Sequence, residues 1–179
     1  HVFMILVTHG IIGAAVGRLF PDKPLVAFIA AITSHFLVDA IPHWHYRLLS
    51  ITRHPDDPIK NDMVIGKKFL IDLVSIGLDF VAGIVLSILI FQGWGGFGML
   101  TTSGFSDISL SIFFGALGGM IPDAFHFLHM KWRHEPLRSL ERFHIWIHSR
   151  VDIDKRHFVG IGSQVVVIAA AIFLSRAIS

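Results

Sequence analysis

The chain contains no cysteine, and only 16% of its 179 residues are charged. The absence of cysteine excludes disulfide bonds and thiolate metal sites, so any metal ion must be held by histidine, carboxylate or backbone oxygen. The scarcity of charge accompanies 53% hydrophobic residues and a mean hydropathy of +0.66, values outside the range of soluble globular proteins. The composition therefore predicts a protein that is solvated by lipid.

Basic residues are scarce outside two segments of the chain. Twelve of the fifteen Lys and Arg residues fall in 42–68 and 129–157, and both segments border hydrophobic runs. This distribution is typical of cytoplasmic loops of a membrane protein rather than of a nucleic-acid-binding surface. The segment 92–107 has no Lys or Arg and is rich in glycine, which predicts a loop on the opposite side. We expect an inner-membrane protein that has the lipid bilayer as its partner and binds no nucleic acid.

Several apolar runs have the length of about 20 residues that a helix needs to cross a bilayer. They predict an all-α integral membrane protein, a bundle of about five transmembrane helices that forms a single domain over 1–179. The first two runs are joined by a short turn and should form a helical hairpin, and 136–149 has the pattern of an amphipathic surface helix. The five runs are 2–19, 24–41, 69–91, 108–128 and 158–175.

Histidine and aspartate recur within or beside these apolar runs. Ionisable groups are costly inside a membrane, so each is a candidate functional residue. Some of them are three or four positions apart, which places both side chains on one helical face, where they can bind one divalent ion or orient one another. These pairs are His35 with Asp39, Asp123 with His126, and His144 with His148. The candidate metal ligands are His9, His35, Asp39, His43, Asp123, His126, His144 and His148.

The predicted topology brings these residues to a similar depth. The second and fourth runs both approach the basic side of the membrane and carry their pairs in their last third. His9 lies about 12 Å into the first run, at a rise of 1.5 Å per residue, and this roughly matches the depth of His35. We expect the pairs of the second and fourth runs to share one metal environment, with His144 and His148 as its cap.

Two aspartates lie in the third run. Asp79 is deep in the run, where an ionised carboxylate needs a cation or a strong donor, and we predict that it is the catalytic proton acceptor. Asp72 lies near the start of the run, and we expect it to pair with Lys67 or Lys68.

Most of the candidate ligands belong to four short phrases. These phrases are Thr8-His9-Gly10, Ser34-His35-Phe-Leu-Val-Asp39, Ile121-Pro122-Asp123-Ala-Phe-His126 and His144-Ile-Trp-Ile-His148-Ser149. Together they resemble the bacterial family of inner-membrane metal-dependent hydrolases, in which similar elements are taken to bind metal. The Ser-His-x-x-x-Asp element stands second here instead of last, and Phe125 replaces a frequent second aspartate. The chain therefore resembles a diverged or rearranged relative.

The predicted function is hydrolysis assisted by a divalent metal ion, with zinc favoured because the candidate ligands are imidazole and carboxylate. The depth of the site predicts a phosphoester or lipid headgroup near the cytoplasmic face as the substrate. Two alternatives stay open. One is a haem- or pigment-ligating accessory subunit with His9 and His35 as axial ligands, and the other is an ion or proton transporter with a His/Asp relay. An oligomer or a larger membrane complex also stays open.

Overall fold

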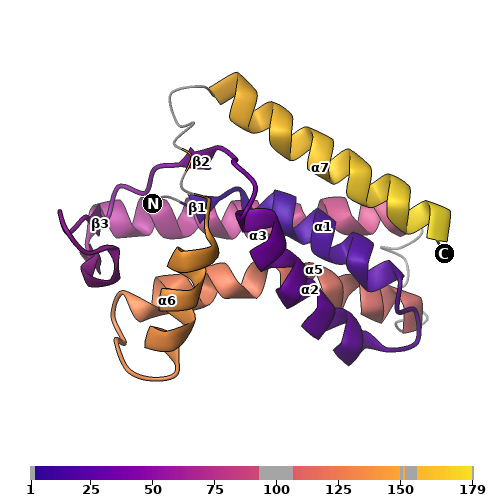
Figure 1. The fold of residues 1–179 in the computed structure, drawn as a ribbon, viewed down its shortest axis with the longest axis horizontal. Helices are drawn as coiled ribbons and strands as arrows, with labels where there is room; N and C mark the ends of the chain where they lie inside the picture. The colour runs from indigo at the N-terminus through magenta and orange to yellow at the C-terminus, as the bar shows by residue number, and fades with distance from the viewer. Residues whose placement is uncertain (1–2, 93–106, 150, 152–156, 179) are drawn as a thin grey trace.

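The computed structural model describes residues 3–92, 107–149, 151 and 157–178, and within them the chain is mainly helical, as predicted. Most of the predicted outer loop lies outside the described residues. The helices are α1 (Leu6–Arg18), α2 (Pro24–Asp39), α3 (Lys67–Gln92), α5 (Asp107–His129), α6 (Leu137–Ile147) and α7 (His157–Ile178) (Figure 1).

Short strands organise the first basic segment. Strand β1 pairs with β2 and strand β3 pairs with β4, both antiparallel, with a 3-10 helix, η1, before β4. The first pair ties the start of α1 to the chain that follows α2. These elements are β1 (Phe3–Met4), β2 (His45–Tyr46), β3 (Ile51–Thr52), η1 (Pro58–Lys60) and β4 (Asp62–Met63).

The described parts of the two basic segments lie toward one end of the bundle (Figure 1). Lys131 Nζ is 3.0 Å from Asp62 Oδ1, and an Nη of Arg133 donates to the carbonyl oxygen of Asn61 at 3.1 Å. These contacts join 42–68 to the start of 129–157, and the side of a membrane that the two segments face stays a prediction.

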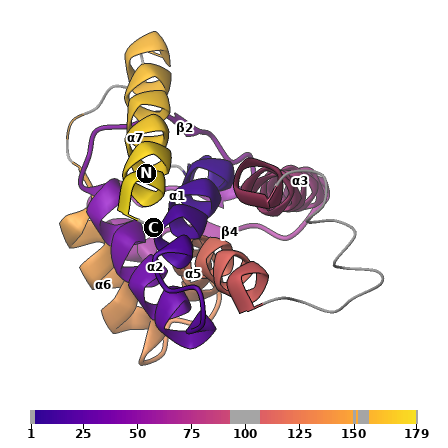
Figure 2. The same cartoon turned by 90° about the vertical axis from the view of Figure 1, so that its right-hand side faces the viewer.

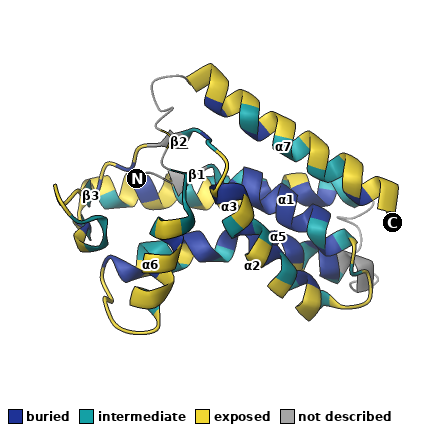
Figure 3. Ribbon diagram, in the orientation of Figure 1, coloured by how far each residue is buried: buried dark blue, intermediate teal, exposed yellow. Residues whose placement is uncertain are grey.

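Helix α1 is the centre of the bundle and contacts α2, α3, α5 and α7 (Figure 2). It is buried on almost every face (Figure 3). Glycines bring it against α5, because a Cβ on Gly13 would overlap the carbonyl oxygen of Gly115 and a Cβ on Gly119 would overlap that of His9. Small residues allow two helix backbones to approach closely in membranes. This close approach holds His9 against the middle of α5.

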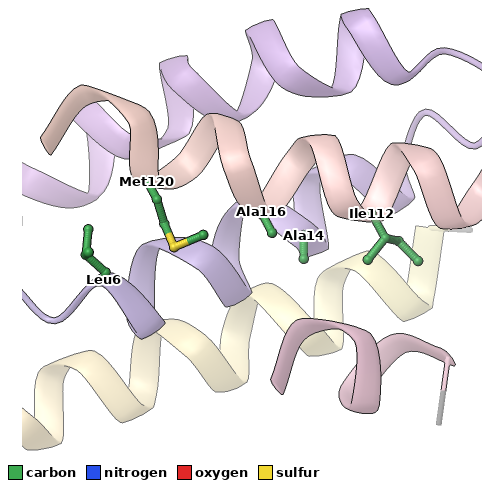
Figure 4. Packing of buried hydrophobic residues seen from close by; sticks show 5 residues of the cluster. All are labelled: Leu6, Ala14, Ile112, Ala116 and Met120. Carbon is green, nitrogen blue, oxygen red and sulfur yellow. The ribbon is translucent and has the colours of Figure 1, made fainter. Parts of the chain in front are cut away.

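A buried apolar cluster fills the remainder of the contact between α1 and α5 (Figure 4). It consists of Leu6 and Ala14 from α1 with Ile112, Ala116 and Met120 from α5. Side chains of α3 pack against its edge. The cluster fixes the position of α1 relative to the helices that carry polar residues.

Three of the described helices are long and apolar enough to cross a membrane: α3, residues 110–129 of α5, and α7. Few residues of α3 and α7 are buried inside the bundle (Figure 3), which fits contact with lipid. Helices α1 and α2 have 13 and 16 residues. At 1.5 Å per residue they reach only about 20 and 24 Å, against a hydrocarbon core of about 30 Å. All five predicted runs contain helices, but five spans are not established, because the turn at Leu19–Lys23 shortens the first two.

Candidate metal centre

Asp39 is the last residue of α2, and it is only 1% exposed. Its Oδ1 lies 3.2 Å from His9 Nε2 and 4.0 Å from His43 Nε2. Its Oδ2 lies 3.1 Å from His35 Nε2 and 2.6 Å from His144 Nε2. One carboxylate is therefore surrounded by four imidazoles, which come from α1, α2, the segment after α2, and α6.

Hydrogen bonds to carbonyl groups orient two of these rings. His35 Nδ1 is 2.7 Å from the carbonyl oxygen of Gly119, and His43 Nδ1 is 2.6 Å from that of Ile41. Since a carbonyl only accepts, each Nδ1 carries the proton, and each Nε2 faces Asp39. A lone pair on Nε2 would repel the carboxylate unless a proton or a metal ion lies between them. Metal-bound histidines commonly have this arrangement, with the second ring nitrogen donating to a carbonyl.

A second pair lies beside the first cluster. His126 Nδ1 of α5 is 2.6 Å from Glu141 Oε2 of α6, and the rings of His126 and His144 have centroids 5.7 Å apart. Burial would raise the pKa of Glu141, but the hydrogen bond from His126 and nearby imidazole charge outweigh burial and lower it. Glu141 is therefore a charged acceptor. It precedes His144 by three positions on one face of α6, and this spacing is the signal by which the sequence could have revealed it.

Asp123 of α5 is 5% exposed and approaches the cluster from another side. Its Oδ2 receives no hydrogen bond from the described residues, and Nδ1 of His9 makes none. Buried polar atoms without partners are costly, more so when the group is charged. A cation near Asp123, His9 and His35 would satisfy them.

The described residues form four groups that can hold a metal ion, each with its ligand atoms within 4.8 Å of one another. All eight ligands predicted from the sequence occur in these groups, and Glu141 is an addition. The expected four-residue environment divides, because His126 joins Glu141 and His144 rather than His35. Whether the side chains bind metal stays a prediction. The groups are His9–His35–Asp123, His35–Asp39–His144, Asp39–His43–His148 and His126–Glu141–His144.

Helix α7 supports the part of the centre that contains His43. Ser163 Oγ donates to the carbonyl oxygen of Pro42 at 2.8 Å, and Gln164 Nε2 donates to that of Trp44 at 2.7 Å. These bonds hold the residues on both sides of His43. Neither Ser163 nor Gln164 was predicted from the sequence to support the centre.

His43, His144 and His148 lie outside the predicted apolar runs, and their imidazoles differ in their affinity for a proton. Burial lowers the pKa of His43 and His148, which favours the neutral ring that a metal ion requires. Burial also disfavours protonation of His144, but the hydrogen bond and the charge of Asp39 outweigh it and raise the pKa. His144 is therefore the ring of this set that best keeps a proton when Asp39 is its partner.

Asp79 of α3 contacts the start of α1, although its depth in the third run suggested a place at the metal site. Its Oδ2 accepts a hydrogen bond from the amide of Leu6 at 2.7 Å, and its Oδ1 accepts one from the amide of Val7 at 3.3 Å. The carboxylate of α3 thus caps the first turn of α1, whose amides lack partners within the helix. This contact accounts for the half-buried carboxylate, and a catalytic role of Asp79 stays a prediction.

Asp72, seven residues before Asp79 on α3, makes a similar contact. Its carboxylate oxygens accept hydrogen bonds from the amides of Leu49 and Ser50 at 3.0 and 2.7 Å. The expected pairing with Lys67 or Lys68 is wrong, because the basic segment folds back and supplies backbone donors. Asp72 therefore anchors this segment to α3.

We expect Glu141→Gln to weaken metal binding by about 10–100-fold, because His126 loses the carboxylate that orients its ring. Zinc titration of the chelator-treated protein measures this change. Glu135→Gln is the matched control, since Glu135 is exposed and its carboxylate contacts only Ser139 among the hydrogen-bond partners described for it. Equal losses in both variants would contradict a role of Glu141 in the centre.

Comparisons with protein-family models, with curated proteins and with solved structures find no match. The geometry of the centre therefore carries the functional assignment.

Proposed function

We propose that this chain is a membrane-embedded, metal-dependent hydrolase whose centre holds two zinc ions bridged by Asp39. The observation that carries the proposal is that the two carboxylate oxygens of Asp39 face different histidines. Oδ1 faces His9 and His43, whereas Oδ2 faces His35 and His144. A carboxylate that bridges two cations needs this arrangement.

The number of candidate ligands supports more than one ion. Zinc takes about four ligands, whereas six imidazoles and three carboxylates contribute to the four groups. His35 can offer only Nε2, because its Nδ1 donates to Gly119. His35 therefore binds one ion at most, and the groups that share it cannot both be filled through it. Two ions, one on each side of Asp39, would satisfy more of the buried polar atoms than a single ion would.

Ligand type favours zinc, since imidazole and carboxylate without thiolate suit this ion. A bound zinc supplies a water of near-neutral pKa and polarises the bond to be cut. Asp123 has an oxygen without a described hydrogen-bond partner, and we assign it to hold an ion or to accept the proton of that water. A cavity of about 50 Å³ beside His126, Glu141 and His144 is large enough for water.

The proposal also places the chain in the family of inner-membrane metal-dependent hydrolases, which its sequence resembles. In support, the four phrases of the resemblance converge, since each of them supplies a residue to the groups around Asp39. The convergence of ligand nitrogens on carboxylates also favours a small cation over a haem. A phosphoester of a lipid is the substrate that fits a centre within apolar helices.

The proposal includes five spans in the inner membrane, with both basic segments cytoplasmic. The absence of cysteine allows single introduced cysteines to be located without background. We expect Lys60→Cys to react with an impermeant reagent only after the cells are opened, and Thr101→Cys to react in intact cells. Labelling of position 60 from outside would contradict the orientation.

Metal analysis together with hydrolysis tests the proposed function. The purified protein should contain about two zinc ions per chain, as expected for a two-metal site. It should hydrolyse bis(p-nitrophenyl) phosphate, lose this activity with a chelator and regain it with zinc. A protein that binds no divalent metal after zinc addition, or one that is fully loaded and inactive toward phosphoesters, would overturn the proposal.

A further inference from the structure

A second, larger cavity lies between α3 and α5 beside the start of α1. Its volume is about 430 Å³, within the range of about 300–1,000 Å³ for small-molecule sites. Its walls are apolar except at one point, where Asp123 contributes a carboxylate. The walls include Leu6 of α1, Leu73, Ile76 and Phe80 of α3, and Met120 and Phe127 of α5.

Asp123 joins this cavity to the candidate metal centre. The residue lines the cavity and also belongs, with His9 and His35, to one of the groups that can hold a metal ion. It is 5% exposed, and its Oδ2 receives no hydrogen bond from the described part of the chain. The one polar group of an apolar cavity is thus buried, lacks a described partner and lies beside the proposed ions.

With α3 in contact with lipid, as proposed, the cavity would open toward the hydrocarbon layer. Two of its wall residues on α3, Leu73 and Phe80, are 47% and 37% exposed. That helix is mainly apolar and is long enough to cross a membrane. A molecule could therefore enter from the hydrocarbon layer without exposing an apolar chain to water.

We propose that this cavity binds the hydrocarbon chain of an amphiphilic phosphoester, with its phosphate at Asp123 and the adjoining metal centre. The inference rests on the proposed function and names the substrate class of that site. Burial of the chain orients the phosphate, since the polar end can find partners only at the Asp123 end of the cavity. Relative to the ligand free in water, each methylene that enters the cavity should tighten binding by up to about fourfold.

Two exposed glycines provide a matched test. A Cβ on Gly77, which lines the cavity, or on Gly162 of α7, which does not, would meet no atom within 4 Å. Gly77→Phe should therefore fill the cavity without displacing a helix, and Gly162→Phe should be the control. Gly77→Leu, a smaller change at the same position, should have an intermediate effect.

The experiment measures binding of butyl, hexyl, octyl and decyl phosphate to the zinc-loaded chain in nanodiscs. Wild type and Gly162→Phe should bind more tightly with each added methylene, whereas Gly77→Phe should lose most of this dependence. Zinc content should be unchanged in Gly77→Phe, because the substitution lies away from the candidate ligands. Hydrolysis of bis(p-nitrophenyl) phosphate should be unchanged in Gly162→Phe, which lies outside the cavity.

The outcomes separate this inference from the proposed function. A dependence on chain length that is the same in Gly77→Phe, Gly77→Leu and wild type would overturn the cavity assignment, even if the protein is an active zinc enzyme. If only the Gly77 variants lose the dependence on chain length, and the protein has no hydrolytic activity, the cavity assignment is upheld and the hydrolase proposal is rejected.

Discussion

Asp39→Asn is expected to remove nearly all bound zinc and the hydrolytic activity with it. Asp39 is the acidic residue nearest to His9, His35 and His144, with its oxygens within 3.2 Å of a nitrogen of each. A neutral amide has one oxygen and cannot bridge two cations. The loss in metal affinity should exceed the roughly 10–100-fold that accompanies changes in outer-shell partners, since this residue contacts both proposed ions.

Asp72→Asn provides the control for this substitution. Asp72 is also a buried carboxylate, but it accepts hydrogen bonds from backbone amides outside the centre. Both variants should unfold more easily, whereas only Asp39→Asn should lose zinc in metal analysis of the purified protein. Retention of about two ions by folded Asp39→Asn would mean that the carboxylate is a proton-sharing packing residue.

Gly119→Ala is expected to lower the stability of the bundle by about 1–3 kcal/mol, the usual cost of forcing extra atoms into a packed interface. Its Cβ would overlap the carbonyl oxygen of His9, and neither helix backbone can yield without separating α1 from α5. The separation should also displace His9 from Asp39. Thermal unfolding in detergent and zinc titration should therefore both show a loss.

Gly77→Ala is the matched control, because a Cβ at that position meets no atom within 4 Å. It should raise stability slightly, by about 0.5–1 kcal/mol, since alanine favours a helix over glycine. If Gly119→Ala is as stable as Gly77→Ala, the close approach of α1 and α5 is wrong.

Much of the helical framework could be predicted from the sequence. The runs 69–91 and 158–175 are continuous and apolar, so they predicted α3 and α7 to within three residues at each end. The amphipathic pattern of 136–149 predicted α6. Helical spacing also identified His35 with Asp39 as one face, and the structure brings these two side chains to 3.1 Å.

Other features depend on contacts between distant segments. Glu141 lies among arginines on an amphipathic helix, a pattern that indicates a solvated surface, and only the docking of α6 beside His126 buries it. Asp79 accepts hydrogen bonds from the amides of Leu6 and Val7, which are more than seventy residues away in the sequence. The sequence alone could not place them, because the approach of α3 to α1 sets that distance.

Anomalous diffraction at the zinc edge from crystals of the zinc-loaded protein can locate the proposed ions. Two peaks are expected about 3.5–4 Å apart, as in two-metal sites, one near each oxygen of Asp39. The ligand nitrogens should lie about 2.0–2.1 Å from these peaks. No peak beside Asp39, or a single peak that contacts only one of its oxygens, would contradict the bridged centre.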